Sequence, residues 1–238
     1  TTSVRRVNSP ALIQDGLFGA VLFDLDGTLV DTAPDMVAVL QAMQASYGVA
    51  PVPYDMGRRY VSNGSIGLLR LGFPDLDIEV GHPFHSEFLD RYAEVVCDNS
   101  RIFAGIDRLL AKLEDAERPW GVVTNKPEYL THPLLDALGL ASRSACIVGG
   151  DTLPVRKPDP APLVLACDMA GVEPHRTVYV GDALRDIEAG LAAGMATIAA
   201  GYGYITEDDD PQSWGADVIA ADTEELAQIV HKAVNLGA

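Results

Sequence analysis

Short apolar segments alternate with helix-like segments over most of this chain, and this alternation restricts the folds that it can form. Strands are predicted at residues 20–23, 120–124, 145–148, 177–180, 196–199 and 217–219. Helices are predicted at residues 106–117, 128–138, 161–170, 184–193 and 223–234. Repeated strand–helix units form a parallel sheet with right-handed crossovers and helices on both faces. The sequence therefore predicts an α/β fold with a doubly wound, Rossmann-like parallel sheet.

A long helical region interrupts this alternation after the first strand. Met36, Leu40, Met43 and Tyr47 fall on one face of a helix predicted at residues 35–47. Two later segments, residues 66–71 and 84–96, are also helix-like, and no convincing strand lies between them. An all-helical insertion is therefore expected within the sheet-forming chain.

These patterns divide the chain into three parts. The core is expected to comprise residues 17–33 and 100–238, and the helical insertion residues 34–99. Residues 1–16 lack the central apolar stretch of a signal peptide, so we expect them to form an N-terminal tail.

Composition excludes several classes of partner. The formal net charge of −17 argues against binding to nucleic acid or to an anionic membrane surface. No apolar run approaches the ~20 residues that a membrane-spanning helix needs. Cys97, Cys146 and Cys167 are scattered and lack C-x-x-C spacing, as is typical of buried free thiols in a reducing compartment. We therefore expect a cytoplasmic protein.

Two aspartates follow the first predicted strand, one residue apart. Asp24 and Asp26 end the apolar run at residues 20–23 and precede Gly27. Two carboxylates at a strand end repel each other and lose solvation, and a bound cation is the usual compensation. The spacing suggests a metal-assisted site in which one carboxylate attacks and the other moves a proton. An isolated Asp-x-Asp-Gly is also compatible with a polar turn.

Polar residues occur at corresponding positions in three later segments. Thr124 and Asn125 end the second strand, where a hydroxyl, an amide and free backbone N–H groups can hold a phosphate. Lys157 precedes a proline-stiffened turn, and Asp182 with Asp186 follows the strand at residues 177–180. Each has a structural alternative: a turn residue, a solvated charge or a helix cap. The ordered recurrence at strand ends, where ligands bind to such sheets, favours a common site.

These segments resemble a known superfamily. DLDGT, TNK, the lysine of RKPDP and GDALRD are similar to the four motifs of the haloacid dehalogenase superfamily of phosphotransferases. VVTNKP, VGGDTLPVRKPDPAPL and the VSNG of residues 61–64 further resemble bacterial phosphoglycolate phosphatases. N-acetylmuramic acid 6-phosphate phosphatases are similar in WGVVTNKP and in the GYI…WGAD segment. The resemblance extends from Gly19 to the C-terminus and implies that the helical insertion is a cap over the site.

The resemblance implies a catalytic role for three residues. Asp24 would be the nucleophile and form an aspartyl-phosphate intermediate. Asp26 would protonate the leaving alkoxide and then activate water, and Lys157 would offset negative charge. The presence of Asp26 favours phosphate chemistry over carbon–halogen cleavage, because the dehalogenases of the superfamily lack this residue.

The same resemblance implies ligands for a metal and for the phosphate. Mg²⁺ would be held by Asp24, the backbone carbonyl of Asp26, Asp182 and Asp186. The phosphoryl oxygens would be oriented by Thr124 and Asn125.

Substrate choice is expected to lie in the insertion. Ser62, Asn63 and Gly64 match a cap segment of phosphoglycolate phosphatases, with Ser62 in place of a more common glycine. His82 and His85 are either substrate-carboxylate ligands or ordinary surface residues.

The implied substrate is a small phosphorylated metabolite. Hydrolysis of 2-phosphoglycolate is the first expectation, and hydrolysis of N-acetylmuramic acid 6-phosphate is the main alternative. A phosphomutase and a catalytically silent binding protein on the same scaffold are further alternatives.

Overall fold

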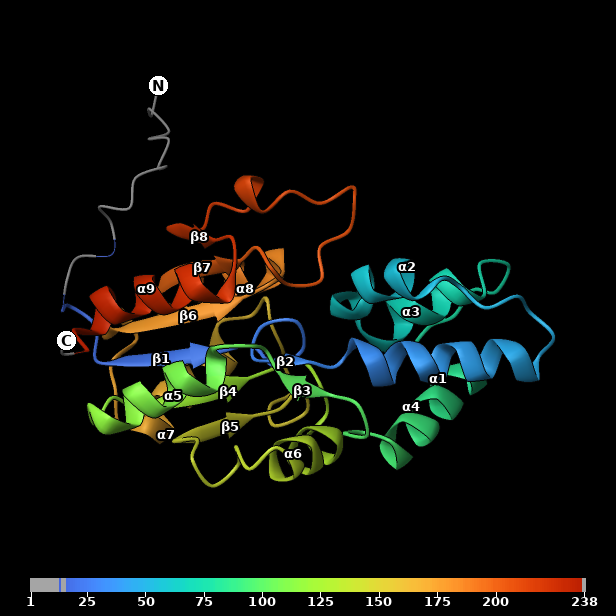
Figure 1. The fold of residues 1–238 in the computed structure, drawn as a ribbon, viewed down its shortest axis with the longest axis horizontal. Coiled ribbons are helices and arrows are strands. Elements are labelled where there is room, and N and C mark those ends of the chain that lie inside the picture. The colour runs from blue at the N-terminus through green and yellow to red at the C-terminus, as the bar shows by residue number, and fades with distance from the viewer. Residues whose placement is uncertain (1–12, 14–15, 237–238) are drawn as a thin grey trace.

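Six parallel strands form the central sheet in the order β5-β4-β1-β6-β7-β8 (Figure 1). The computed structural model describes residue 13 and residues 16–236. The strands are β1 (Ala20–Phe23), β4 (Trp120–Val123), β5 (Cys146–Val148), β6 (Thr177–Gly181), β7 (Ala196–Ala200) and β8 (Val218–Ala220). Every strand predicted from the sequence is present, with each end within about one residue of its predicted position. The Rossmann-like sheet is therefore confirmed.

Five helices of the core connect or follow these strands. They are α5 (Ile106–Asp115), α6 (Glu128–Ala137), α7 (Ala161–Ala170), α8 (Leu184–Ala192) and α9 (Thr223–Val234). Helix α5 ends two residues before its predicted end, because Glu117 has a left-handed backbone with φ of 54°. The Arg118 amide then donates to the carbonyl of Leu113 at 2.8 Å, which closes the helix end.

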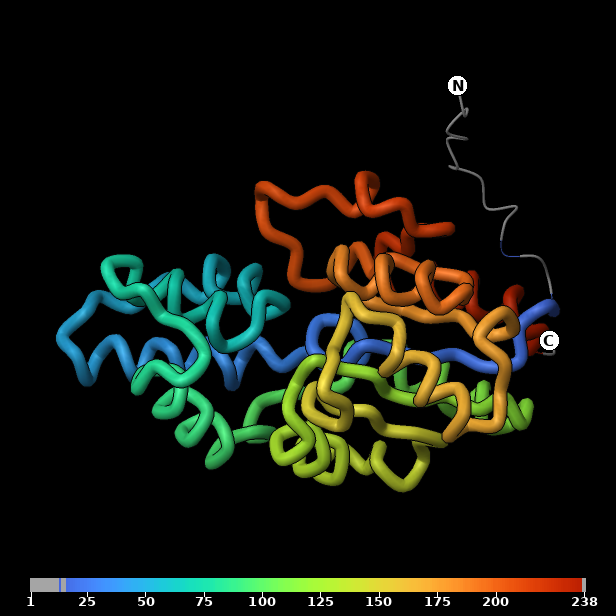
Figure 2. Tube along the Cα trace, turned by 180° about the vertical axis from the view of Figure 1, so that it is seen from behind, coloured from blue at the N-terminus to red at the C-terminus, as the bar shows by residue number. Residues whose placement is uncertain are grey.

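The helices cover both faces of the sheet. Helices α5, α6 and α9 pack with Val21 and Phe23 of β1 on one face. Figure 2 shows α7 and α8 on the opposite face, where Leu22 of β1 packs with residues of both helices. Successive side chains of a strand point to opposite faces, so a continuous apolar strand serves both layers.

Four helices between the first and second core strands project from one end of the sheet (Figure 1). They are α1 (Ala33–Ser46), α2 (Tyr54–Arg59), α3 (Gly64–Gly72) and α4 (Pro83–Glu94), and we call them the cap. Met36, Leu40 and Met43 of α1 are buried in a separate cap core, as the stripe predicts, whereas Tyr47 is 49% exposed. Helix α2 was not predicted, because its only buried residue is Gly57 and its sequence has no apolar stripe.

Two very short strands link the cap to the core. β2 (Val30–Asp31) and β3 (Arg101–Ile102) pair antiparallel where the chain leaves and re-enters the core. A strand of two residues is too short to show alternation of apolar and polar side chains, so the sequence did not predict β2 or β3. Short 3₁₀ turns complete the regular structure at Val61–Asn63, Pro174–Arg176 and Pro211–Ser213.

Other sequence predictions concern the chain ends and the thiols. Most of the predicted N-terminal tail lies outside the described residues, but Ile13 is buried in the main core and the Gly16 amide donates to the Lys232 carbonyl.

Cys146 and Cys167 are buried and free, and Cys97 is half-buried and free. Among the described residues, none of the helices has both the length and the apolar character that crossing a bilayer requires.

Candidate active site

Three polar residues meet at the carboxyl ends of neighbouring strands. Asp24 follows β1, Thr124 follows β4 and Asp182 follows β6, and β1 pairs with both β4 and β6. The chain order of the strands reverses at β1, so these ends flank the topological switch point. All three side chains are buried. The convergence predicted from the sequence is therefore confirmed.

Asp24, Asp182 and Asp186 form a cluster of buried carboxylates. One oxygen of each lies within 4.8 Å of the others. Asp186 lies in the first turn of α8, where its Oδ2 accepts from the Ala183 amide at 3.1 Å. Ala183 occupies the cap position of α8, so the alternative of Asp182 as a helix cap is wrong.

Burial and mutual repulsion disfavour the ionised forms of Asp182 and Asp186. Burial and the charges of Asp24 and Asp186 raise the pKa of Asp182 to about 8. Burial also raises the pKa of Asp186, although Lys157 opposes this shift. Asp182 Oδ1 is buried without a hydrogen bond from any described residue. Three carboxylate oxygens with one unpartnered atom suit a hard divalent cation such as Mg²⁺.

Glycines allow the backbone to close around this cluster. Gly27 has φ of 81°, and a methyl group there would overlap the Asp182 carboxylate. A methyl group at Gly203 would overlap the same side chain. The glycine of the Asp-x-Asp-Gly motif is therefore required by both its backbone angle and its contact with Asp182.

Lys157 is the cation closest to the cluster. Its Nζ lies 2.9 Å from Asp24 Oδ1 and 2.8 Å from Asp186 Oδ1, and it donates to Tyr179 Oη at 2.7 Å. The side chain is 1% exposed, so the alternative of a solvated surface charge is wrong. Asn125 holds the lysine's backbone, because its Nδ2 donates to the Lys157 carbonyl and its Oδ1 accepts from the Lys157 amide. The amide of Asn125, expected to orient phosphate, is thus engaged by the loop that positions Lys157.

Asp26 stands apart from the carboxylate cluster. Its Oδ1 accepts from Thr32 Oγ1 at 2.6 Å and pairs with Lys126 Nζ at 2.9 Å. No described residue donates a hydrogen bond to Oδ2, and Asp26 lines the main cavity. This geometry suits a group that exchanges protons with a ligand. The predicted metal contact through the Asp26 backbone carbonyl stays a prediction.

Lys126 and Tyr92 are site residues that the sequence reasoning did not identify. Lys126 Nζ donates to Tyr92 Oη of α4 at 3.0 Å, so the cap contacts the partner of Asp26. Burial lowers the pKa of Lys126, but Asp26 and Tyr92 outweigh burial and raise it above its ordinary value. Lys126 belongs to the TNK motif, which was the available signal, whereas nothing in the sequence marks Tyr92.

The cap also contacts the carboxylate cluster directly. The Ser62 hydroxyl donates to Asp182 Oδ2 at 2.5 Å, and Arg185 Nη2 donates to the Ser62 carbonyl at 2.6 Å. The Tyr204 amide donates to the same Asp182 oxygen at 2.8 Å. Ser62, expected to bind substrate, therefore lies against a candidate metal ligand, and Arg185 and Tyr204 were not predicted from the sequence.

A cavity of about 840 Å³ extends from these core residues into the cap. Asn63 and Gly64 line it, as expected for the cap segment. His85 lines it and lies 3.1 Å from Ser65 Oγ, and burial lowers the pKa of His85. His82 instead caps α4, because its Nδ1 accepts from the backbone amide that follows Pro83. Of the two histidines, only His85 is among the described residues that line this cavity.

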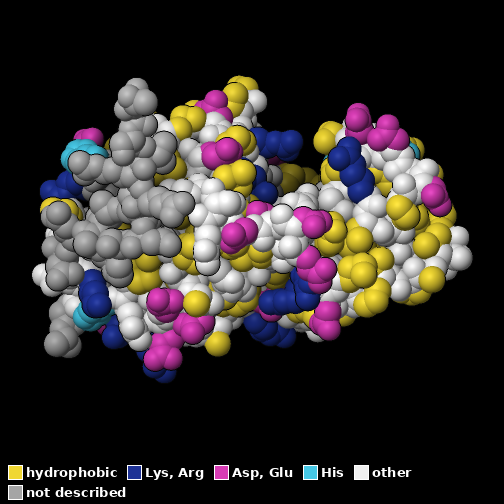
Figure 3. Space-filling model, turned by 90° about the horizontal axis from the view of Figure 1, so that it is seen from above, with side chains coloured by type: hydrophobic (Ala, Val, Ile, Leu, Met, Phe, Trp, Pro, Cys, Tyr) yellow, Lys and Arg dark blue, Asp and Glu magenta, His cyan; other side chains and the backbone are white. Residues whose placement is uncertain are grey.

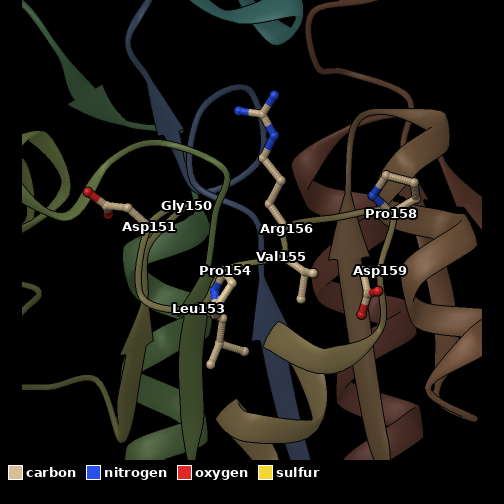
Figure 4. Close-up of a pocket in the computed structure, with 8 residues that line it drawn as sticks. All are labelled: Gly150, Asp151, Leu153, Pro154, Val155, Arg156, Pro158 and Asp159. Atoms are coloured by element: carbon tan, nitrogen blue, oxygen red, sulfur yellow. The ribbon is translucent and has the colours of Figure 1, made fainter.

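A second, more open cavity of about 740 Å³ adjoins the first. Residues of the loop after β5 line it, and Arg156 and Pro158 line both cavities. In Figure 4 the Arg156 side chain points away from the sheet, toward the cap. Figure 3 shows a hollow between the two lobes with Lys or Arg side chains at its edge. Lys and Arg side chains therefore line the cavity, although the net charge of the chain is −17.

Comparison with known proteins places the chain among phosphatases. The sequence profile of the family described as haloacid dehalogenase-like hydrolase matches residues 21–200. An N-acetylmuramic acid 6-phosphate phosphatase of Pseudomonas aeruginosa is 47% identical over 216 residues, which cover 90% of this chain and 96% of that protein. A phosphoglycolate phosphatase of Xanthomonas campestris pv. campestris is 46% identical over 207 residues, which cover 87% and 94%. The crystal structure of a predicted phosphoglycolate phosphatase from Haemophilus somnus has a TM-score of 0.78 and 28% identity, with 90% and 98% of the chains covered.

Proposed function

The chain belongs to the haloacid dehalogenase-like hydrolase family, and we propose that it is a Mg²⁺-dependent phosphomonoester hydrolase with Asp24 as nucleophile. The observation that carries this proposal is the buried cluster of Asp24, Asp182 and Asp186 with Lys157 between two of its members. A strand-end aspartate beside a metal site and a buried lysine suits attack on an anionic phosphate.

The side chains of Asp24, Asp182 and Asp186 would hold Mg²⁺, together with the backbone carbonyl of Asp26. The bound ion would supply positive charge that attracts the phosphate and offsets charge on the transferring group. Lys157, which pairs with Asp24 and Asp186, would add to this effect. The unpartnered, buried Asp182 Oδ1 supports this ligand set.

The reaction would proceed in two displacements at phosphorus. In the first, a carboxylate oxygen of Asp24 forms a bond to phosphorus, the bond to the substrate alkoxide breaks, and Asp26 Oδ2 gives that alkoxide a proton. In the second, Asp26 takes a proton from water as the water oxygen attacks the aspartyl phosphate, which releases inorganic phosphate and restores Asp24. Thr124 would orient the phosphoryl oxygens through its hydroxyl.

Two substrates are candidates, and both carry a carboxylate as well as a phosphate. The sequence resemblance favours 2-phosphoglycolate, whereas identities of 47% and 46% to the two kinds of relative do not separate it from N-acetylmuramic acid 6-phosphate. The cavity of about 840 Å³ favours the larger molecule, because pockets that bind drug-sized ligands have volumes of about 300–1,000 Å³. We propose a small phosphorylated acid as the ligand and the cytoplasm as the compartment.

The two further alternatives have less support. A catalytically silent binding protein would not need Asp24, Asp26 and Asp182, all of which are present. A phosphomutase would need an aspartyl phosphate that survives until the group is returned, whereas the role proposed for Asp26 is to activate water for its hydrolysis.

Steady-state kinetics with both phosphates test the proposal. We expect Mg²⁺-dependent release of phosphate from at least one of them, with kcat/KM above about 10⁴ M⁻¹s⁻¹. Absence of release from both, and from p-nitrophenyl phosphate, would contradict the proposed activity. Comparison of the two kcat/KM values decides the substrate.

A further inference from the structure

The main cavity ends in the cap at polar residues that the proposed chemistry does not use. Arg70 of α3, Ser65 and His85 line the cavity, as does Glu79 of the loop before α4. The same cavity contains Asp24, so a single ligand can extend from the nucleophile to this group. These residues belong to the cap, so in the proposed function they would contact the leaving group of the substrate.

Arg70 is an exposed residue that lines this space. Its Nε donates to the Ile78 carbonyl at 2.9 Å, which fixes the guanidinium at the cavity. Within the described part of the chain its two terminal nitrogens make no hydrogen bond, and no carboxylate, Glu79 included, lies within ion-pair distance. A fixed guanidinium with two free N–H edges is a typical bidentate partner of a carboxylate.

Helix α3 runs from the candidate metal site into the cap, and Arg70 lies near its far end. Just before the helix begins, Ser62 touches Asp182. At its end, the Gly72 carbonyl accepts from Gln44 of α1 at 2.9 Å, far along the cap. Arg70 is six residues beyond Gly64, which corresponds to about 9 Å along the helix axis. Because α3 runs away from the contact between Ser62 and Asp182, this rise favours a ligand of about 9 Å over a much shorter one between Asp24 and Arg70.

This span separates the two candidate substrates. In 2-phosphoglycolate three bonds join phosphorus to the carboxyl carbon, a reach of about 4 Å. In N-acetylmuramic acid 6-phosphate the carboxylate is on an ether at C3, eight bonds from phosphorus, a reach of about 9–10 Å. Between the two ends, Ile66, Phe88 and Leu89 give the cavity an apolar wall on which a sugar ring and an acetyl group can pack.

We propose that the cap end of the cavity is a carboxylate subsite in which Arg70 binds the acid group of a hexose-sized phosphorylated sugar acid. This proposal rests on the proposed function, because it requires the phosphate of the same molecule to lie at Asp24. Ser65 and His85 would bind a neighbouring hydroxyl or ether oxygen. Glu79, the one acidic side chain at this end of the cavity, would accept from a sugar hydroxyl.

A pair of sugars that differ only in the acid tests the subsite. The measured quantity is the ratio of kcat/KM for N-acetylmuramic acid 6-phosphate to that for N-acetylglucosamine 6-phosphate, which lacks the acidic ether. We expect a ratio above about 10 in the wild type and a fall of roughly ten- to hundredfold in Arg70→Gln, as for a lost charged hydrogen bond. Inhibition by the product N-acetylmuramic acid should weaken by a similar factor.

Two other arginine variants serve as comparisons. Arg91 also lies in the cap but pairs with Glu87 and does not line the cavity, so Arg91→Gln should keep the wild-type ratio. A wild-type ratio near 1, or an Arg70→Gln ratio equal to that of the wild type, would overturn the proposal. If the ratio of the two kcat/KM values fell in Arg156→Gln and stayed at the wild-type value in Arg70→Gln, the assignment of the subsite to Arg70 would be overturned. Failure to hydrolyse any ester, p-nitrophenyl phosphate included, would instead contradict the proposed function.

Discussion

The Ser62 hydroxyl donates a hydrogen bond of 2.5 Å to Asp182 Oδ2, although 120 residues separate the two in the sequence. Ser62 belongs to the cap and Asp182 to the sheet, so this bond joins the lid-like part of the molecule to the candidate metal site. Asp182 Oδ1 stays without a partner among the described residues and is the oxygen open to a cation. The cap therefore helps to orient a candidate metal ligand while leaving its Oδ1 atom free.

We expect Ser62→Ala to weaken Mg²⁺ binding about tenfold, because partners that orient metal ligands typically contribute 10–100-fold to affinity. Isothermal titration calorimetry with Mg²⁺ measures the change. Ser65→Ala is the matched control, since Ser65 contacts His85 and not the cluster. Equal Mg²⁺ affinities in wild type and Ser62→Ala would show that the bond does not orient Asp182.

The metal-free protein should lose stability as pH rises from about 4 to about 8. Burial, together with the charges of Asp24 and Asp186, raises the pKa of Asp182 to about 8 in the folded state. The same side chain titrates near ~3.9 when unfolded. The folded state thus holds this proton more tightly, and the stabilisation is complete below about pH 4 and lost as pH rises through about 8.

Thermal unfolding in EDTA at several pH values measures this effect. The Tm of the wild type minus that of Asp182→Asn should decline steadily between pH 5 and pH 8, because the variant cannot titrate at this position. Subtracting the variant removes the contribution of other groups. A pH-independent difference would mean that Asp182 has an ordinary pKa in the fold.

The sheet and its carboxylates were predictable because they depend on local patterns and on topology. The apolar run before Asp24 indicates a strand, and the same pattern precedes Thr124 and Asp182. Once the strands are parallel, their carboxyl ends share one edge of the sheet. The three side chains lie close together because β1 lies between β4 and β6, an order that local patterns do not specify.

The contacts between cap and core were not predictable in the same way. Tyr92 reaches Lys126 across 34 residues, and its sequence position resembles that of any aromatic residue on a helix. Such pairings depend on how two packed units meet, which hydrophobic periodicity does not encode.

Asp24→Asn should lower kcat at least about a thousandfold for every substrate, because an amide oxygen is a poor nucleophile toward phosphorus. The fold should be retained, since asparagine has nearly the same shape. Phosphate release under saturating Mg²⁺ and the cooperativity of thermal unfolding are measured on the same preparation. Asp115→Asn, at an exposed position in α5, should behave as wild type, and normal turnover by Asp24→Asn would exclude the covalent scheme.

Lys126→Met should lower kcat by roughly ten- to hundredfold, because Asp26 loses the charged partner that fixes its Oδ1. The effect should be larger on kcat than on KM if Asp26 acts in proton transfer and not in binding. Lys112→Met, at an exposed position in α5, controls for the loss of one positive charge. A change confined to KM would indicate that Lys126 binds substrate directly.

Gly27→Ala should both destabilise the fold and remove Mg²⁺ binding. At φ of 81° a side chain costs about 1–2 kcal/mol, and the added carbon would also lie 2.8 Å from Tyr204 Cδ2 and overlap the Asp182 carboxylate. Gly48→Ala separates the two effects, because Gly48 has φ of 70° and no atom within 4 Å of the added carbon. We expect the control to lose only about 1–2 kcal/mol of unfolding free energy and to bind Mg²⁺ normally. If Gly27→Ala bound Mg²⁺ as tightly as Gly48→Ala does, the close approach of the motif backbone to Asp182 would have no part in forming the metal site.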